Sequence, residues 1–296
     1  MRKLLVTGAL ALSLILPSYS LSSSKEDTKQ KQQLETLIIK DGMYDDHNAF
    51  VDESKYSLEK ILESVELIGC EVGYTMTYTD KGGKIVKEYR ISRVIGTGTV
   101  IEKKNGKAYI LTNDHVTKIG FLDEMTDGVV ITENYREVYV IKKGLITPRF
   151  VKATPVASDS KLDISLLEVE DSEDFVKFPY KIGNSDDLRP GDFVWIAGNP
   201  HGLVDYVLKG NVSKVSYPYD NRLFMIGCAV EPGYSGGAVI AIRDGEYELV
   251  GVVVATLVRQ NETEETYAMT GYGIAIKIND AMKIVNTYFD SLKNKK

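Results

Sequence analysis

The chain has 296 residues, of which 43% are hydrophobic and 26% are charged, so it is long enough to bury a large core and has an ordinary globular composition. Its net charge of −6 and its lack of a basic stripe argue against a nucleic-acid partner. A polyanionic substrate is disfavoured for the same reason.

Residues 1–20 have the pattern of a secretory signal peptide. A basic start at Arg2 and Lys3 is followed by an apolar run over 4–16 and by the small residues Ser18 and Ser20. We expect cleavage after Ser20 and export to a secreted, periplasmic or cell-surface location. The run is short for a spanning helix, which needs ~20 residues, and an uncleaved amino-terminal anchor stays open as the alternative membrane link.

Residues 21–63 are polar and predict a linker with one short helix. Its weak helical stripe, Leu34, Leu37 and Ile38, ends at Gly42. His47 lies among acidic residues and is interpreted as a surface histidine.

From about residue 64 the chain consists of short runs rich in Val, Ile, Tyr and Thr, separated by Gly, Asn and Asp, which is typical of an all-β sandwich or barrel. The predicted strands form two series: 65–78, 84–95, 98–103, 108–112, 138–141 and 164–169, then 193–197, 206–217, 223–229, 238–243, 249–258 and 273–278. Two lobes are therefore expected, over about 64–172 and 190–278. Helical spacing of apolar residues over 279–292 predicts a carboxyl-terminal helix.

The two cysteines, Cys70 and Cys228, are too few for a disulfide framework and are interpreted as buried free thiols. A single bridge between them is the alternative. Neither has a histidine or an acid at ligand spacing, so we expect no metal site, and we expect no cofactor.

Residues 229–238, Ala-Val-Glu-Pro-Gly-Tyr-Ser-Gly-Gly-Ala, contain the candidate nucleophile Ser235. The backbone N–H groups of Gly233 and Ser235 are candidates for an oxyanion hole. The same stretch also matches the G-x-S-x-G turn of α/β-hydrolases, but those enzymes place their histidine after the serine. All three histidines here precede Ser235, which excludes that fold and leaves the order histidine, acid, serine.

His115 follows an apolar strand in Tyr-Ile-Leu-Thr-Asn-Asp-His-Val (109–116) and is the candidate general base. Asp163 opens the alternating stretch Leu-Asp-Ile-Ser-Leu-Leu (162–167) and is the candidate acid that orients His115. Asp159 is the alternative acid, and Asp114 is expected to face away. 

These motifs resemble the trypsin-like serine proteases and, within them, the HtrA/Deg family. The residues that carry the resemblance lie at 111–116, 162–167, 231–237 and 197–203, and a closing strand at 271–276 is similar too. The resemblance covers about residues 64–290 and implies two six-stranded β-barrel lobes. The helices expected from the sequence pattern form an amino-terminal helical extension before these lobes and a carboxyl-terminal helix after them. The resemblance also implies hydrolysis of protein or peptide substrates and a possible homo-oligomer. 

The chain departs from the HtrA/Deg pattern in several places. Tyr234 stands where the family usually has asparagine, Val253 takes a position that is usually polar, and His201 replaces an aromatic residue and is interpreted as a packing or surface group. The PDZ domain that usually follows is expected to be absent. 

The resemblance also places a substrate pocket beside Ser235. Its floor is expected at Ala229, where an enzyme selective for Lys or Arg carries an aspartate. We therefore expect cleavage after small or medium aliphatic residues, in a pocket formed by Ala229, Val253, Val254, Ala255, Gly273 and Ala275. A secreted serine endopeptidase is the leading function, and a catalytically inactive homologue that acts as a binding or chaperone-like module is the alternative.

Overall fold

A computed structural model describes residues 38, 40–46, 51–53, 55–118, 128–142, 147–170, 172–218, 220–260 and 266–294, with the backbone alone over 255–270. These residues all belong to one compact unit that begins at Ile38. The predicted signal peptide, the helical stripe at 34–37 and His47 lie outside the described residues.

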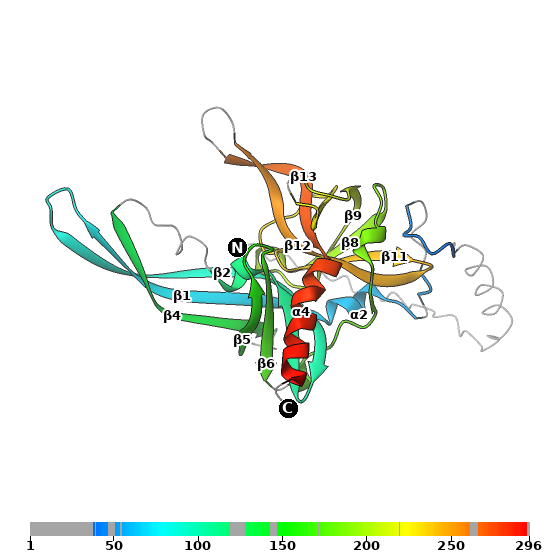
Figure 1. The fold of residues 1–296 in the computed structure, drawn as a ribbon, viewed down its shortest axis with the longest axis horizontal. Helices are drawn as coiled ribbons and strands as arrows, with labels where there is room; N and C mark the ends of the chain where they lie inside the picture. Colours follow the sequence, from blue (N-terminus) through cyan, green and yellow to red (C-terminus); the bar gives the residue numbers. More distant parts are fainter. Residues whose placement is uncertain are drawn as a thin grey trace, which may run out of the picture. The chain divides into compact units, whose positions relative to one another are not determined.

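The first lobe is a closed barrel of six strands in the order β1-β2-β3-β6-β5-β4 (Figure 1). The strands are β1 (Val65–Thr79), β2 (Ile85–Lys104), β3 (Lys107–Thr112), β4 (Val129–Lys142), β5 (Arg149–Asp159) and β6 (Ile164–Glu170). Its interior is lined by apolar residues that include Ile68, Val72, Ile110 and Leu167. Because side chains alternate along each strand, these residues recur at every second position.

The second lobe is a ring of six antiparallel strands in the order β11-β8-β9-β10-β13-β12, closed by pairing between β11 and β12. The strands are β8 (Phe193–Gly198), β9 (Tyr206–Lys214), β10 (Leu223–Ile226), β11 (Ala238–Arg243), β12 (Glu246–Gln260) and β13 (Thr266–Lys277). A short strand, β7 (Lys181–Ile182), pairs in parallel with β12. The expected all-β fold with two six-stranded lobes is thus confirmed.

Several predicted strand bounds were wrong. The stretches 84–95 and 98–103 form the single strand β2, and β4 begins nine residues before the predicted 138. No strand was predicted over β5, which contains Pro155. A proline has no N–H for the ladder, and it is accommodated here where the pairing of β5 with β6 shifts register between Pro155 and Ala157.

The predicted carboxyl-terminal helix is α4 (Ile278–Lys293), which packs against β5, β6 and β12 (Figure 1). Ile278, Ala281 and Val285 are its buried residues, at the spacing of one helix face. Phe289 lies 4.8 Å from the ring of Tyr109 in the first lobe, while Asn279 donates its backbone N–H to Ser185, which precedes the second ring. The helix therefore connects both lobes.

Candidate active site

Ser235 lies in the loop between β10 and β11, in two successive tight turns. The N–H of Tyr234 donates to the Glu231 carbonyl at 3.2 Å, and the N–H of Gly237 donates to the Tyr234 carbonyl at 2.7 Å. The third residues of these turns, Gly233 and Gly236, have φ of +100° and +86°. Such turns need a positive φ at that position, which glycine adopts without a Cβ clash. The glycines around Ser235 are therefore required by the backbone path.

The Ser235 loop is hydrogen-bonded to the first lobe through Thr97 of β2. The Thr97 N–H donates to the Ser235 carbonyl at 2.7 Å, and its hydroxyl donates to the Gly233 carbonyl at 2.7 Å. The same hydroxyl accepts the N–H of Asn199 at 2.9 Å. Thr97 was not singled out from the sequence, although a threonine between two glycines, Gly96 and Gly98, was the available signal.

The N–H groups of Gly233 and Ser235 are the predicted oxyanion-hole donors. Among the described residues neither N–H has an acceptor, whereas both carbonyls accept hydrogen bonds from Thr97. Carbonyls held in this way leave the two N–H groups available to a substrate oxygen. Donors without an internal acceptor are one condition for an oxyanion hole, and these two N–H groups meet it.

His115 is the second residue of α3 (Asp114–Thr117), a single turn that follows β3. Its Nδ1 lies 2.6 Å from Oδ2 of Asp163, and its backbone N–H donates to Oδ1 of Asp163 at 2.8 Å. The Asp163 backbone has φ of +59°, in the left-handed region that aspartate tolerates better than most residues. Asn113 donates to the Asp163 carbonyl at 2.8 Å and thereby holds this backbone in place. Asn113 is a second positioning residue that the sequence alone did not reveal.

The neighbouring carboxylates have other partners. Asp114 is buried and accepts from the Ser160 hydroxyl at 2.6 Å and from Lys118. Asp159 accepts the backbone N–H groups of Lys161 and Leu162, at 2.9 and 3.1 Å, within its own turn. Asp163 is therefore the carboxylate that the fold places against His115, and Asp114 faces away as expected.

The Ser235 hydroxyl does not engage His115 in this structure. Its Oγ donates to the carbonyl of Val254 at 3.0 Å. The structure thus brings the predicted acid and base into contact and places the predicted nucleophile beside β12. In this structure the Ser235 hydroxyl is therefore bonded to β12 and not to His115.

The residues expected to form the substrate pocket fall into two groups. Ala229 is exposed and Val254 is half-buried, whereas Val253 and Ala275 are fully buried in the core of the second lobe. Gly273 is also buried, since a Cβ there would lie 2.5 Å from Val230. The Ala255 side chain lies outside the described part. Among the predicted pocket residues whose side chains are described, Ala229 and Val254 are those that can meet a substrate directly.

Tyr234 directs its side chain into the core of the second lobe. Its side chain is 1% exposed, and its ring lies over Gly198, where an added Cβ would be 2.6 Å from Cδ1. The Tyr234 hydroxyl has no hydrogen-bond partner among the described residues, and burial raises the pKa of this phenol to about 12. The Tyr234 side chain therefore anchors the Ser235 loop to the core of the second lobe and is not exposed to a substrate.

We expect Tyr234→Phe to raise the free energy of unfolding by about 1 kcal/mol, because a buried hydroxyl without a partner is costly. Thermal or urea unfolding of the two proteins measures the difference. A loss of about 1 kcal/mol would instead show that the hydroxyl makes a stabilising hydrogen bond.

His201 and the two cysteines take no part in the contact between His115 and Asp163. His201 is exposed, with its Nε2 3.7 Å from Oε2 of Glu231, which agrees with its interpretation as a surface residue. Cys70 and Cys228 are free, as predicted, and burial raises the pKa of each thiol to about 11. Neither thiol is therefore a reactive thiolate near neutral pH.

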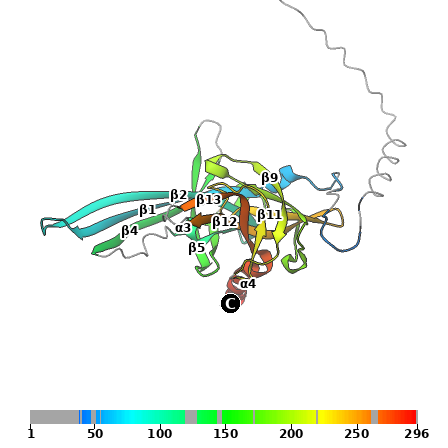
Figure 2. The same ribbon diagram turned by 90° about the horizontal axis from the view of Figure 1, so that it is seen from above.

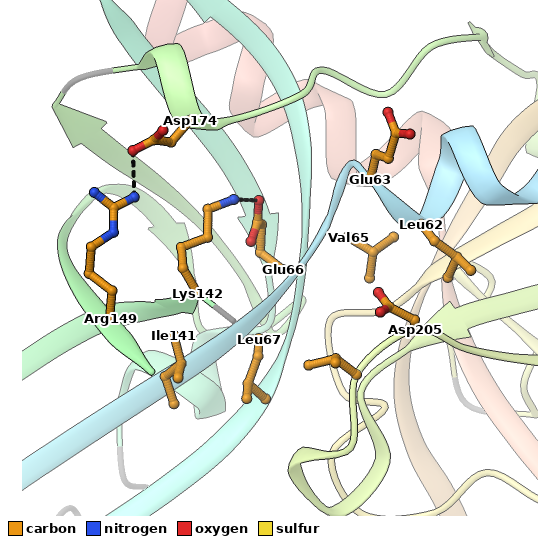
Figure 3. A pocket seen from close by; sticks show the side chains of 11 residues that line it. Leu62, Glu63, Val65, Glu66, Leu67, Ile141, Lys142, Arg149, Asp174 and Asp205 are labelled. Carbon is orange, nitrogen blue, oxygen red and sulfur yellow. Dashed lines mark hydrogen bonds and ion pairs between the residues drawn. The ribbon is translucent and has the colours of Figure 1, made fainter. Parts of the chain in front are cut away.

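A separate pocket of about 450 Å³ lies between the start of β1, the end of β4 and the loop that follows the 3-10 helix η4 (Pro200–Gly202). Four of its charged side chains form two ion pairs, Lys142 with Glu66 and Arg149 with Asp174 (Figure 3). Burial raises the pKa of Glu66, and the nearby Lys142 ammonium partly offsets this. The pocket contains none of the predicted catalytic residues.

No group of His, Cys, Asp and Glu within the described ranges is arranged to hold a metal ion. No helix among the described residues is long and apolar enough to cross a membrane.

Residues 96–252, more than half of the chain, match the family model of the trypsin-like peptidase domain. The chain belongs to the trypsin-like peptidase family. The match includes His115, Asp163 and Ser235 and both sides of the Thr97 contact. 

Curated relatives of this trypsin-like chain include three proteins named as bacterial serine proteases. A probable periplasmic serine protease do/HhoA-like of Haemophilus influenzae is 31% identical over 65% of this chain and 36% of its own length. A probable periplasmic serine endoprotease DegP-like of Buchnera aphidicola is 26% identical over 75% of this chain and 46% of its own. A serine protease HtrA-like of Staphylococcus aureus is 28% identical over 70% of this chain and 25% of its own length. The chain thus spans less than half the length of these relatives.

Among solved structures, the HtrA-type protease AlgW with a decapeptide has a similar fold. The TM-score is 0.50 at 20% sequence identity, over 79% of this chain and 66% of AlgW. The relatives confirm the resemblance to the HtrA/Deg family, and the solved structure shows the shared fold.

Proposed function

We propose that this trypsin-like chain is a serine endopeptidase that cleaves protein or peptide substrates, with Ser235 as nucleophile, His115 as general base and then acid, and Asp163 as the group that orients His115. The observation that carries the proposal is the double contact of Asp163 with His115, through Nδ1 at 2.6 Å and the backbone N–H at 2.8 Å. This contact fixes the proton on Nδ1 and leaves Nε2 as the acceptor.

In the proposed reaction, His115 Nε2 removes the proton of Ser235 as Oγ attacks the carbonyl carbon of the substrate. The N–H groups of Gly233 and Ser235 stabilise the negative charge that develops on the carbonyl oxygen. The imidazolium, held by Asp163, then donates its proton to the leaving amine, and a water molecule hydrolyses the acyl-enzyme by the same steps. 

A fluorophosphonate probe tests this proposal because only an activated serine reacts quickly. We expect the probe to label the wild-type protein rapidly and at Ser235 alone. We expect no labelling of Ser235→Ala. Ser291→Ala is a matched control, because this exposed serine lies in the last turn of α4, outside the Ser235 loop, and its loss should leave labelling intact.

One observation favours a second candidate function, a non-catalytic homologue that binds unfolded segments or partners. The Ser235 hydroxyl donates to the Val254 carbonyl at 3.0 Å instead of to His115. If this state persisted with substrate bound, Ser235 would stay inactive. Failure of the folded protein to react with the probe at any pH from 5 to 9 would support this second function.

The proposed substrate preference is for small or medium aliphatic residues before the cleaved bond. Ala229, the proposed floor of the pocket, is exposed and supplies no charge for a basic side chain, and a cation that a bound substrate buried there would lack a partner, which is costly. Each methylene that a substrate buries contributes ~0.8 kcal/mol. We therefore expect Ala, Val, Ile or Leu to dominate a peptide-library profile, and a dominant Arg, Lys or Glu would contradict the preference.

We also propose export of the chain, with residues 1–20 acting as a signal peptide or as an uncleaved anchor. The basic and apolar pattern of this segment and the word periplasmic in the names of two relatives support export. Assembly into a homo-oligomer is compatible with the family resemblance and can be measured by sedimentation.

A further inference from the structure

Strands β1, β2 and β4 extend beyond the first barrel as a three-stranded arm (Figures 1 and 2). Within the arm, β2 pairs with β1 from Thr99 down to Ile85, whereas β3 pairs with β2 only from Thr99 onward. None of the described strands pairs with the other edge of β2 between Ile85 and Ile95. We call this stretch the outer edge of β2.

The direction of the backbone groups along β2 follows from two hydrogen bonds. The N–H of Val100 donates to the Ser64 carbonyl, on the β1 side, and the N–H of Thr97 donates to the Ser235 carbonyl, on the opposite side. Because the direction alternates along a strand, every second residue from Thr97 presents its N–H and carbonyl to the outer edge. These residues are Ile85, Lys87, Tyr89, Ile91, Arg93 and Ile95.

The side chains of these six residues lie on one face of the arm. The four large apolar ones are strongly exposed, with Ile85 at 67%, Tyr89 at 57%, Ile91 at 46% and Ile95 at 40%. A long edge strand with exposed apolar residues is a ready template for another strand, and proteins usually block such edges. We infer that this edge is kept open for an extended segment.

The outer edge of β2 is continuous with the candidate active site. Thr97, the next residue in the outward series, bonds to the Ser235 carbonyl, and a Cβ at Gly96 would contact Val116 of α3 and the Ser235 carbonyl. The α3 turn also carries His115, which must reach the leaving amine. Ala229 and Val254, which can meet the side chain before the cleaved bond, belong to the second lobe. The part of a substrate after the cleaved bond is therefore directed over the first lobe, toward β2.

We propose that the outer edge of β2 binds the substrate segment downstream of the cleaved bond as an added β-strand. The proposal rests on the proposed endopeptidase function and extends it to a binding site for a long extended segment of substrate after the cut. Main-chain hydrogen bonds would supply the affinity, as in other strand-addition complexes. At ~3.3 Å per residue, the eleven positions from Ile85 to Ile95 span about 35 Å.

The test uses peptides that are identical up to two residues after the cleaved bond and are then extended by none, four or eight residues of alternating Val and Thr. We expect kcat/KM to rise at least tenfold with length, mainly through a lower KM. An equal kcat/KM for all three lengths would overturn the proposal.

Two isoleucine-to-proline variants distinguish a role of the outer edge of β2 from a general effect of proline in the arm. Ile91→Pro removes an outward N–H of β2, and we expect the gain with peptide length to fall to less than twofold. Ile131→Pro is the matched control, because Ile131 pairs with Met76, whose N–H and carbonyl face β2, so the Ile131 N–H points to the opposite edge of the arm. This control should keep the full gain, and an equal loss in both variants would overturn the proposal.

N-methylated peptides give the same test without changing the protein. Methyl groups on the alternate downstream amides whose N–H groups point to β2 should abolish the gain in kcat/KM with peptide length. Methyl groups on the intervening amides, which point away from β2, should preserve that gain. If both series keep the gain, strand addition is wrong.

Binding to Ser235→Ala distinguishes failure of this proposal from failure of the proposed function. If wild type cleaves no peptide, fluorescence anisotropy should still show tighter binding of the long peptide to Ser235→Ala, weakened at least fivefold by Ile91→Pro in the same protein. No length dependence in anisotropy would overturn the edge proposal. If instead Ile91→Pro changed the sedimentation of the protein alone, and peptide length had no effect, the edge would belong to an interface with a second copy.

Discussion

Asp163→Asn is expected to lower kcat for peptide cleavage about 10⁴-fold without unfolding the protein. Both carboxylate oxygens of Asp163 accept hydrogen bonds from His115, one from the backbone N–H and one from Nδ1. An asparagine has one acceptor oxygen and one NH₂ donor in their place. If the oxygen keeps the backbone N–H, the NH₂ faces Nδ1 and forces the proton onto Nε2. His115 then cannot accept the proton of Ser235.

Asp159→Asn is the matched control for this prediction. Asp159 lies four residues earlier, and the same one of its oxygens, Oδ1, accepts both backbone N–H groups of its turn, so an asparagine can replace it. We expect near-normal steady-state kinetics and an unchanged thermal midpoint. Retained activity in Asp163→Asn together with a loss in Asp159→Asn would reverse the assignment of the acid.

Gly236→Ala should both destabilise the protein and inactivate it. Gly236 has φ of +86°, and its added Cβ would lie 1.9 Å from the Thr97 carbonyl oxygen and 2.5 Å from the Thr112 hydroxyl. Since Thr97 also binds the Ser235 carbonyl, the loop must separate from β2 to make room. We expect a loss of about 3 to 5 kcal/mol in the free energy of unfolding. The accompanying displacement of Ser235, of about 1 Å, should cost about 10²-fold in activity or more.

Gly106→Ala is the control that distinguishes the steric clash expected in Gly236→Ala from the backbone strain of a positive φ. Gly106 also has a positive φ, of +77°, but a Cβ there would have no atom within 4 Å. Its substitution should cost only the strain of a left-handed residue, about 1 to 2 kcal/mol, with normal kcat. Equal losses of stability in the two variants would show that the contact between the Ser235 loop and Thr97 is unimportant.

The hydrophobic pattern was sufficient to predict the all-β fold, the two lobes and the final helix. Alternation of side chains in a strand and the 3.6-residue repeat of a helix are local properties, and apolar residues such as Ile278, Ala281 and Val285 reveal them directly. Local patterns also failed in predictable places. No strand was predicted over β5, where Pro155 is accommodated by a register shift that depends on the neighbouring strand β6.

The sequence by itself determined the order of His115, Asp163 and Ser235 and hence the class of chemistry, because that order excludes the α/β-hydrolase alternative. Only the tertiary structure decided which carboxylate meets His115, since Asp159 and Asp163 lie in one turn and are separated by where each side chain points. It also decided that Val253 and Ala275 belong to the core and that the Ser235 hydroxyl bonds to Val254. The structure likewise showed that none of the described strands pairs with the outer edge of β2. Each of these depends on contacts between segments far apart in the chain, which no local pattern encodes.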